Sequence, residues 1–335
     1  MNRTAVSESR TDRLLMLTPR TPRTRERQRF DLTALLGEEE EIDISGLSDL
    51  IGQTWNIYAT SALFGFQRDD VSLKLYSKKL REEIARHLSH EDLTYDANFS
   101  IVENIIPRSN HENYSAIKIQ VTAKSSGNEE AKLIYKGILL SWRMAQHIEP
   151  DLKNSTRLPL LLCRGTCSCM NAVHNVINHM FDCLVMALPV NEDDLNWLIP
   201  IIIISVNKDE QPTVSGEIHM EYTVPELPAT DTIRVKFDAS ELRKILTNII
   251  DQNNITVNTI LDRKHVELFH EVLRMQMLTI GGLHLGLCTL HRINLPGITI
   301  TGNRMKIMNV DIANRILLYL YEKAYDTFHM IHINV

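Results

Sequence analysis

The periods of hydrophobic and polar positions along the chain divide it into recognisable elements. Residues 69–88 begin with a pair of capping aspartates and continue with apolar side chains at roughly helical spacing. This pattern predicts an amphipathic helix. The period then falls to two. Residues 117–121 alternate apolar and polar side chains, and a second apolar run over residues 132–142 follows the turn-rich stretch 124–128. This arrangement predicts a β-hairpin.

The second half of the chain mixes helical and strand-like periods. Apolar spacing predicts helices over residues 171–181, 240–250, 266–277 and 311–324. Strand-like patterns lie at residues 214–224, 233–237, 283–293, 298–301 and 305–310. Because helices and strands are interspersed, the predicted fold class is α+β.

Three apolar segments need separate interpretations. Residues 157–162 are interpreted as an apolar connection, and Trp197 to Val206 as a buried strand, because this run is about half of the length that a bilayer requires and contains Pro200. Residues 327–335 alternate and predict a final strand. A strand at a chain end can accept a partner's strand, unless it is an ordinary interior strand of the chain's own sheet.

Charge separates a leader from a body. Among residues 1–29 there are eight arginines and three acidic residues, so the net charge of −6 divides into +5 on this arm and −11 on the remainder. Residues 1–46 are predicted to be a disordered leader, and residues 47–335 a globular body that is either one unit or two subdomains dividing near residues 150–160. The arm either contacts nucleic-acid phosphates or is merely solvated. Its candidate phosphate-binding side chains are Arg20, Arg23, Arg25, Arg27 and Arg29.

The leader also contains two candidate phosphorylation sites. Thr18 and Thr21 are each followed by proline and arginine, which is the pattern that proline-directed kinases favour. A phosphate on either residue would offset about −1.5 to −2 charges of the basic arm.

No constellation of catalytic residues stands out. The densest set of potential metal ligands is Cys163, Cys167, Cys169, His174 and His179. A structural zinc site normally shows two paired knuckles, and a second pair is missing here, so thiols packed beside a helix are the preferred interpretation. The Gly-x-Ser-x-Gly signature of serine hydrolases is also missing. We expect no enzymatic activity, cofactor or metal, and no secretory or membrane segment.

Several short motifs follow one another along residues 47–335, discontinuously. They are Leu50 to Tyr58, Leu63 to Phe66, Leu158-Pro159-Leu160, Phe181-Asp182-Cys183, Leu195-Asn196-Trp197, Val266 to Phe269 and the C-terminal helix and strand. An Arg/Thr/Pro leader with a Thr-Pro-Arg element precedes them. Taken in this order, the motifs resemble the centromere protein L family of inner-kinetochore subunits.

This resemblance implies a curved body of antiparallel sheets with flanking helices and no enzymatic chemistry. It further implies a heterodimer with centromere protein N that supports kinetochore assembly and chromosome segregation, alongside other inner-kinetochore subunits in the nucleus, at the centromere. Contact with the centromeric nucleosome would be indirect, and a homodimer without the partner stays open. By resemblance, the partner docks near the chain's end. The residues to which this role is carried are Phe328, Met330, Ile331 and Ile333.

Two other classes of function stay open. One is a DNA-binding protein that uses the basic N-terminal arm, whose affinity would fall steeply with salt. The other is a cysteine-dependent or zinc enzyme, which would require metal or a reactive thiol in the cluster between Cys163 and Cys169.

Overall fold

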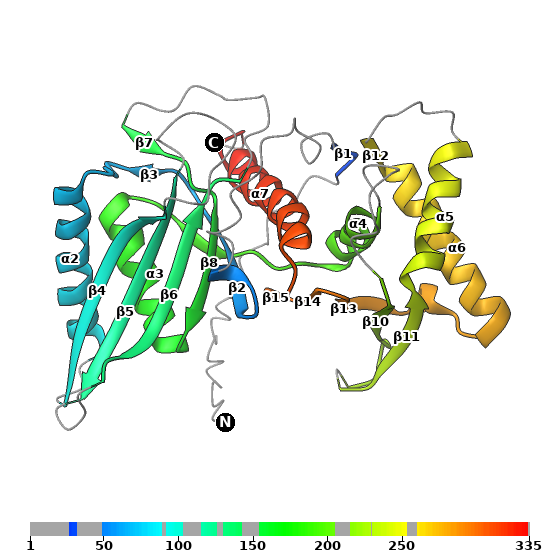
Figure 1. Cartoon of the computed structure of the whole chain (residues 1–335), viewed down its shortest axis with the longest axis horizontal. Helices are drawn as coiled ribbons and strands as arrows, with labels where there is room; N and C mark the ends of the chain where they lie inside the picture. The colour runs from blue at the N-terminus through cyan, green and yellow to red at the C-terminus, as the bar shows by residue number, and fades with distance from the viewer. Residues whose placement is uncertain are drawn as a thin grey trace, which may run out of the picture.

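The computed structural model describes residues 27–31, 49–88, 92–102, 115–125, 130–142, 154–204, 215–228, 230–252 and 260–333. Predictions about Thr18, Thr21, Arg20, Arg23 and Arg25 lie outside these residues. The helices alternate with strands along the chain (Figure 1), as the α+β prediction requires. The described helices are α2 (Asp70–Leu88), α3 (Cys167–Phe181), α4 (Glu192–Ile203), α5 (Ala239–Gln252), α6 (Arg263–Gly281), the 3-10 turn η3 (Leu285–Leu287) and α7 (Val310–Ile333).

Most of the described strands join one 11-stranded antiparallel sheet. Its order is β11-β10-β13-β14-β15-β2-β8-β6-β5-β4, with β9 paired to β2. The strands of the sheet are β2 (Thr54–Thr60), β4 (Leu93–Val102), β5 (Ala116–Ser125), β6 (Lys132–Leu140), β8 (Leu160–Gly165), β9 (Val185–Ala187), β10 (Glu217–Thr223), β11 (Thr232–Asp238), β13 (Thr289–Leu295), β14 (Ile298–Thr301) and β15 (Arg304–Ile307). Two small sheets pair β1 (Arg29–Asp31) with β12 (Ile260–Asp262) and β3 (Leu63–Phe64) with β7 (Ser155–Thr156).

Two hydrophobic cores lie on opposite faces of the central strands. Leu161 and Cys163 of β8 face the smaller core, which α2 and α3 cover, whereas Leu160 and Leu162 face the larger core, which contains α4 to α7. Strand β8 is therefore buried on both faces. Its unbroken apolar run follows from this double burial, and the interpretation of residues 157–162 as a connection is wrong from Leu160 onward.

Helix α4 replaces the strand predicted over Trp197 to Val206. Its first turn carries a capping box in which Asn191 and Asp194 satisfy each other's backbone N–H groups. Ile201, Ile202 and Ile203 are all buried. Because every residue from Trp197 to Ile203 is buried, this part of the helix shows no amphipathic period, and the strand prediction is wrong for the residues as far as Ile203.

The C-terminal segment is helical where the sequence predicted a strand. Helix α7 continues to Ile333, so the strand predicted over residues 327–335 is wrong for residues 327–333, and residues 334–335 lie outside the described part. Phe328 is half-buried against the larger core. An α-helix pairs its backbone N–H and C=O groups within itself. The segment therefore cannot extend a sheet as a strand.

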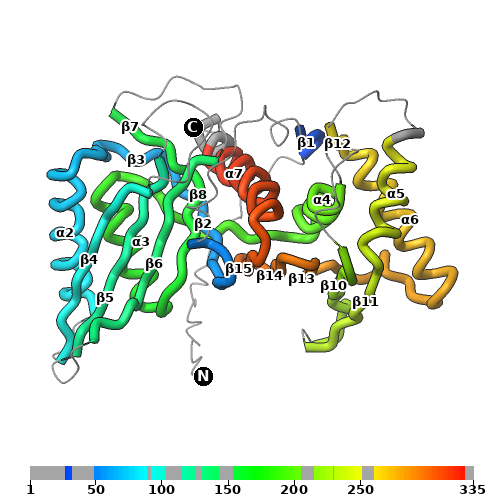
Figure 2. Tube along the Cα trace, in the orientation of Figure 1, coloured from blue at the N-terminus to red at the C-terminus, as the bar shows by residue number. Residues whose placement is uncertain are grey.

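Part of the leader is packed on the body. Residues 29–31 form β1 and pair with β12, which lies beside them in Figure 2. Phe30 is only 1% exposed and belongs to the larger core. Residues 27–31 thus depart from the prediction that order begins near Leu47.

Candidate functional site

The predicted partner-binding residues lie on the last turns of α7. Phe328 packs partly into the core, and the side chains of Met330, Ile331 and Ile333 lie outside the described part of the structure. Their role in partner binding stays a prediction. Strand pairing through these residues is wrong, because their backbone is helical.

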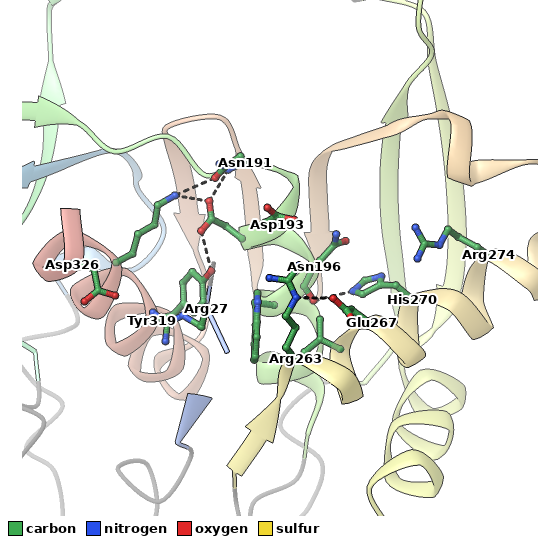
Figure 3. A pocket seen from close by; sticks show the side chains of 14 residues that line it. Arg27, Asn191, Asp193, Asn196, Arg263, Glu267, His270, Arg274, Tyr319 and Asp326 are labelled. Carbon is green, nitrogen blue, oxygen red and sulfur yellow. Dashed lines mark hydrogen bonds and ion pairs between the residues drawn. The ribbon is translucent and has the colours of Figure 1, made fainter. Parts of the chain in front are cut away.

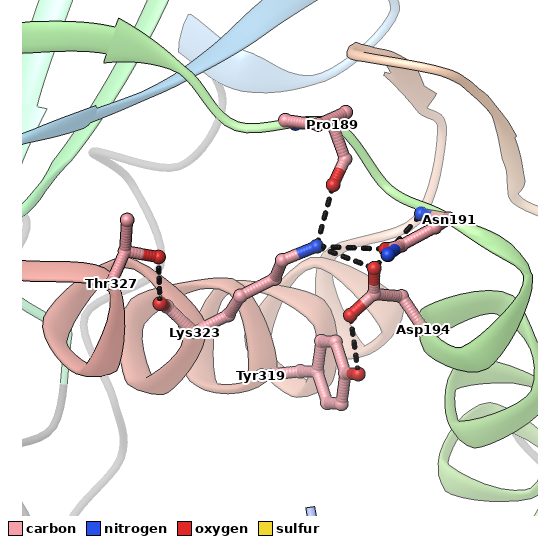
Figure 4. A network of polar contacts seen from close by, with 6 residues as sticks. All are labelled: Pro189, Asn191, Asp194, Tyr319, Lys323 and Thr327. Carbon is pink, nitrogen blue, oxygen red and sulfur yellow. Dashed lines mark hydrogen bonds and ion pairs between the residues drawn. The ribbon is translucent and has the colours of Figure 1, made fainter. Parts of the chain in front are cut away.

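A buried polar network joins α7 to the start of α4 (Figure 4). The Lys323 ammonium forms an ion pair with the Asp194 carboxylate and donates to the carbonyl of Pro189 and, at 3.2 Å, to Asn191 Oδ1. Asp194 also accepts the Tyr319 hydroxyl at 2.9 Å and the Asn191 backbone N–H at 2.8 Å. Every polar group of this network therefore has a partner.

The network is buried and its two charges are paired, and we name it the joint between α4 and α7. Lys323 and Asp194 are each 8% exposed. Burial lowers the pKa of Lys323, although the Asp194 carboxylate opposes the shift, and burial raises the pKa of Tyr319 well above its usual value. The phenol is therefore a neutral donor. Asp194 thus caps α4 from a buried position.

A cleft of about 150 Å³ opens beside this network between α4, α6 and α7 (Figure 3). Its charges are largely paired, since Arg263 Nε lies 2.6 Å from Glu267 Oε1 and the N–H of His270 Nε2 donates to the Asn196 carbonyl at 2.8 Å. Burial lowers the pKa of His270 to about 4, which keeps the imidazole neutral near pH 7. The His270–Asn196 contact joins α6 to α4, whereas the Arg263–Glu267 pair lies within α6, and neither contact holds a nucleophile against a base.

The cysteine and histidine cluster does not assemble as one site. Cys163, Cys169 and His174 are buried, whereas Cys167 and His179 are exposed. Cys163 Sγ lies 3.7 Å from His174 Nε2. Burial raises the pKa of Cys163 to about 12 and lowers that of His174 to about 4, so both are neutral. Among the described residues, no group of three or more His, Cys, Asp or Glu could hold a metal ion.

The large sheet ends in two edge strands, β11 and β4. Within the described residues, each has a ladder partner on one side only, β10 and β5 respectively. The unpaired N–H and C=O groups of such an edge can bind another strand. Helix α2 packs against β4, and α5 against β11. Both edges are candidates for the strand pairing that α7 cannot provide.

Four exposed apolar side chains lie at the β11 end of the sheet. They lie on the last turns of α6 and on η3, which leads into β13, the neighbour of β10. We name them the α6 patch. Its members are Met275 (56% exposed), Leu278, Ile280 (78% exposed) and Leu287. Helix α5 contacts both α6 and β11, so the α6 patch and the open edge lie at the same end of the sheet. Exposed apolar side chains on a surface are typical of a protein interface.

The sheet also presents a polar face that helices leave open. In Figure 1, α4, α5 and α7 lie above the strands from β15 to β11, α6 lies to the side of β11, and no described helix lies below these strands. The register aligns two rows of polar side chains across six strands on that face. The first row is Arg234, Glu221, Arg292, Thr301, Arg304 and Asn56. The second row is Lys236, His219, Asn294, Thr299, Lys306 and Thr54.

Cations predominate on this face although the body as a whole is acidic. Arg234 lies 2.6 Å and Arg292 3.5 Å from the Glu221 carboxylate, and Lys236 lies 3.1 Å from Glu217. Arg304 and Lys306 are exposed, and neither forms an ion pair with another residue in the described part of the chain. We name the two rows the basic face. Single-sequence reasoning missed it, because alternating polar residues on separate strands give no local charge run.

No helix in the described part of the chain is both long and apolar enough to cross a bilayer. A family model described as Centromere protein L matches residues 49–325. No curated protein matches the chain. The matched span runs from the turn before β2 to near the end of α7, and it includes the sheet, both edges, the α6 patch and the basic face.

Proposed function

Because the chain belongs to the centromere protein L family, and is therefore a centromere and kinetochore protein, we propose that it is a non-enzymatic scaffold subunit. In this proposal it heterodimerises with centromere protein N in the nucleus and supports kinetochore assembly and chromosome segregation. The β11 edge and the adjoining α6 patch are the observation that supports the proposal.

Backbone and side chains at this end favour the same mode of binding. A partner strand on β11 would satisfy the backbone groups on its open side, and its flanking elements would cover Met275 and Ile280. Backbone pairing supplies affinity that depends little on sequence, whereas a complementary apolar patch supplies specificity. The exposed side chains of β4 itself are mostly polar, as in Thr94 and Asp96, and the exposed apolar side chains near it are Val71 and Leu75 of α2. Without the partner, a second copy of the chain could pair at the same edge.

A pair of charge substitutions tests this proposal. The double variant Met275→Asp with Ile280→Asp is expected to weaken binding of centromere protein N by on the order of a hundredfold, because two carboxylates would be buried in the interface. The fold should not change, since both side chains face solvent. Binding is measured by isothermal titration calorimetry and the fold by circular dichroism.

Helix α2 offers a matched control. Val71 and Leu75 are 77% and 61% exposed, close to Ile280 and Met275, so Val71→Asp with Leu75→Asp adds the same charge to an equally exposed surface. This control should bind as the unmodified chain does. Equal weakening by both double variants, or by neither, would contradict the proposed surface.

Contact with DNA is a second candidate function, and the basic face is the observation that favours it. Two of the five candidate arginines of the arm already have acidic partners in the structure, because Arg27 is ion-paired with Glu322 and Arg29 with Asp262. Exposed cations aligned across a sheet can instead follow a phosphate backbone.

Charge reversal on the basic face tests this second function. Arg304→Glu with Lys306→Glu is expected to make the slope of log affinity against log salt shallower by about 2, because about one counterion-releasing contact is lost per cation. The control Lys74→Glu with Lys79→Glu, on the exposed side of α2, should leave the slope unchanged. Fluorescence anisotropy with duplex DNA measures both. An unchanged slope in the Arg304 and Lys306 variant excludes this face.

A further inference from the structure

The docked segment of the leader behaves as a bound peptide. Residues 27–31 lie against β12, α6 and α7, which are more than 200 residues away in the sequence. Phe30 pairs with Leu261 in the ladder and inserts its ring into the larger core. The backbone N–H of Arg263 donates to the Gln28 carbonyl at 2.9 Å, which extends the pairing by one more hydrogen bond. The segment is thus held by both backbone and side-chain contacts.

Arg27 supplies the second anchor. Its guanidinium carbon lies 4.5 Å from the Tyr319 ring centroid and 5.3 Å from that of Phe30, and the guanidinium forms an ion pair with Glu322. Burial opposes the charge of Arg27, yet Glu322, Tyr319 and Asp326 together outweigh that effect and raise the pKa of the arginine. The arginine is therefore charged, stacked and largely enclosed, with only 14% of its side chain exposed.

The receiving surface selects for these two side chains. Tyr319 and Glu322 lie one turn apart on α7 and together present an aromatic face and a carboxylate, a pair that suits a guanidinium better than an ammonium. The intervening Arg29 behaves differently: 75% of its side chain is exposed, and it contacts Asp262 at 3.2 Å. Recognition therefore falls on the first and fourth residues of Arg27-Gln28-Arg29-Phe30.

We propose that the body carries a peptide-binding groove for an extended Arg-x-x-Phe segment, and that the chain's own leader fills it in cis. The groove is formed by β12, the start of α6, and α7. This inference is independent of the proposed partner interface, which lies on β11 and at the far end of α6. One consequence is that the preceding part of the leader is tethered at residue 27, beside α7, instead of near residue 47.

Cleaving the leader from the folded full-length chain tests this proposal. A protease recognition sequence is inserted between residues 38 and 39, the protein is purified intact, and it is then cut. The leader fragment is expected to co-elute with the body in gel filtration. A synthetic peptide of residues 24–34 should displace the fragment, which fluorescence anisotropy of a labelled fragment can follow.

Variant peptides identify the anchors. Arg27→Ala should weaken displacement by at least about tenfold, and Phe30→Ala by on the order of a hundredfold. Arg29→Ala is the matched control, because exposed ion pairs contribute little, and its effect should stay below about fivefold. The proposal is overturned if the fragment separates from the body on cleavage, or if the Arg27→Ala and Phe30→Ala peptides compete as well as the unmodified one.

Discussion

Replacing Lys323 with methionine is expected to lower the free energy of unfolding by about 3–5 kcal/mol. The substitution keeps most of the side-chain volume but leaves the Asp194 carboxylate buried without its countercharge. It also removes the donor to the carbonyl of Pro189. Urea unfolding followed by circular dichroism measures the loss, and an unchanged m-value shows that the unfolding transition is otherwise the same.

A second substitution separates the charge from the packing. Asp194→Asn in the Lys323→Met background removes the unpaired charge, while the side-chain carbonyl can still accept from the Tyr319 hydroxyl. The double variant should be at least about 1 kcal/mol more stable than Lys323→Met alone. A Lys323→Met variant that loses less than about 1 kcal/mol would show that the ion pair does not hold α7 against α4.

Replacing Trp55 with alanine is expected to cost about 3–5 kcal/mol of unfolding free energy. Trp55 is fully buried in β2, where it pairs with Met305 across the ladder, and its indole N–H donates to the Leu50 carbonyl at 2.9 Å. Strand β2 connects the two halves of the large sheet, between β15 and β8. The cavity therefore opens at the centre of the molecule, and both cores should melt together in calorimetry.

Trp55→Phe provides the graded comparison. It retains an aromatic ring and leaves the Leu50 carbonyl without the indole donor, so a loss of about 1–3 kcal/mol is expected. Leu75→Ala, on the exposed side of α2, should change stability by no more than about 0.5 kcal/mol. Equal losses for Trp55→Phe and Trp55→Ala would mean that the hydrogen bond, and not the packing of the ring, dominates at this position.

These expected effects bear on the proposed scaffold function. A subunit that connects other proteins must keep its binding surfaces at fixed relative positions. The α6 patch lies at one end of the molecule, whereas the basic face lies beneath the sheet strands that run inward from that end (Figure 1). The sheet and the buried joint between α4 and α7 connect these surfaces. Loss of the joint should therefore affect partner binding without any change at the interface itself.

The sequence by itself determined the elements that bury one face and expose the other. Helix α2, strand β5 and helix α6 were predicted close to their observed positions, because one-sided burial leaves a period of 3.6 or 2 in the sequence. The family was likewise readable from ordered motifs, and the family model confirms it. The α+β class followed from the same interspersed periods.

Only the tertiary structure decided the elements that are buried on all sides and the contacts between distant residues. Helix α4 and strand β8 show no period because core surrounds them, so the sequence did not distinguish helix, strand and connection. The apolar and polar alternation near Phe328 does not mark a strand, because α7 continues through these residues. Asp194 and Lys323 are 129 residues apart, and Arg27 and Glu322 are 295 apart. Local patterns carry no information about such pairs, because chain folding alone brings them together.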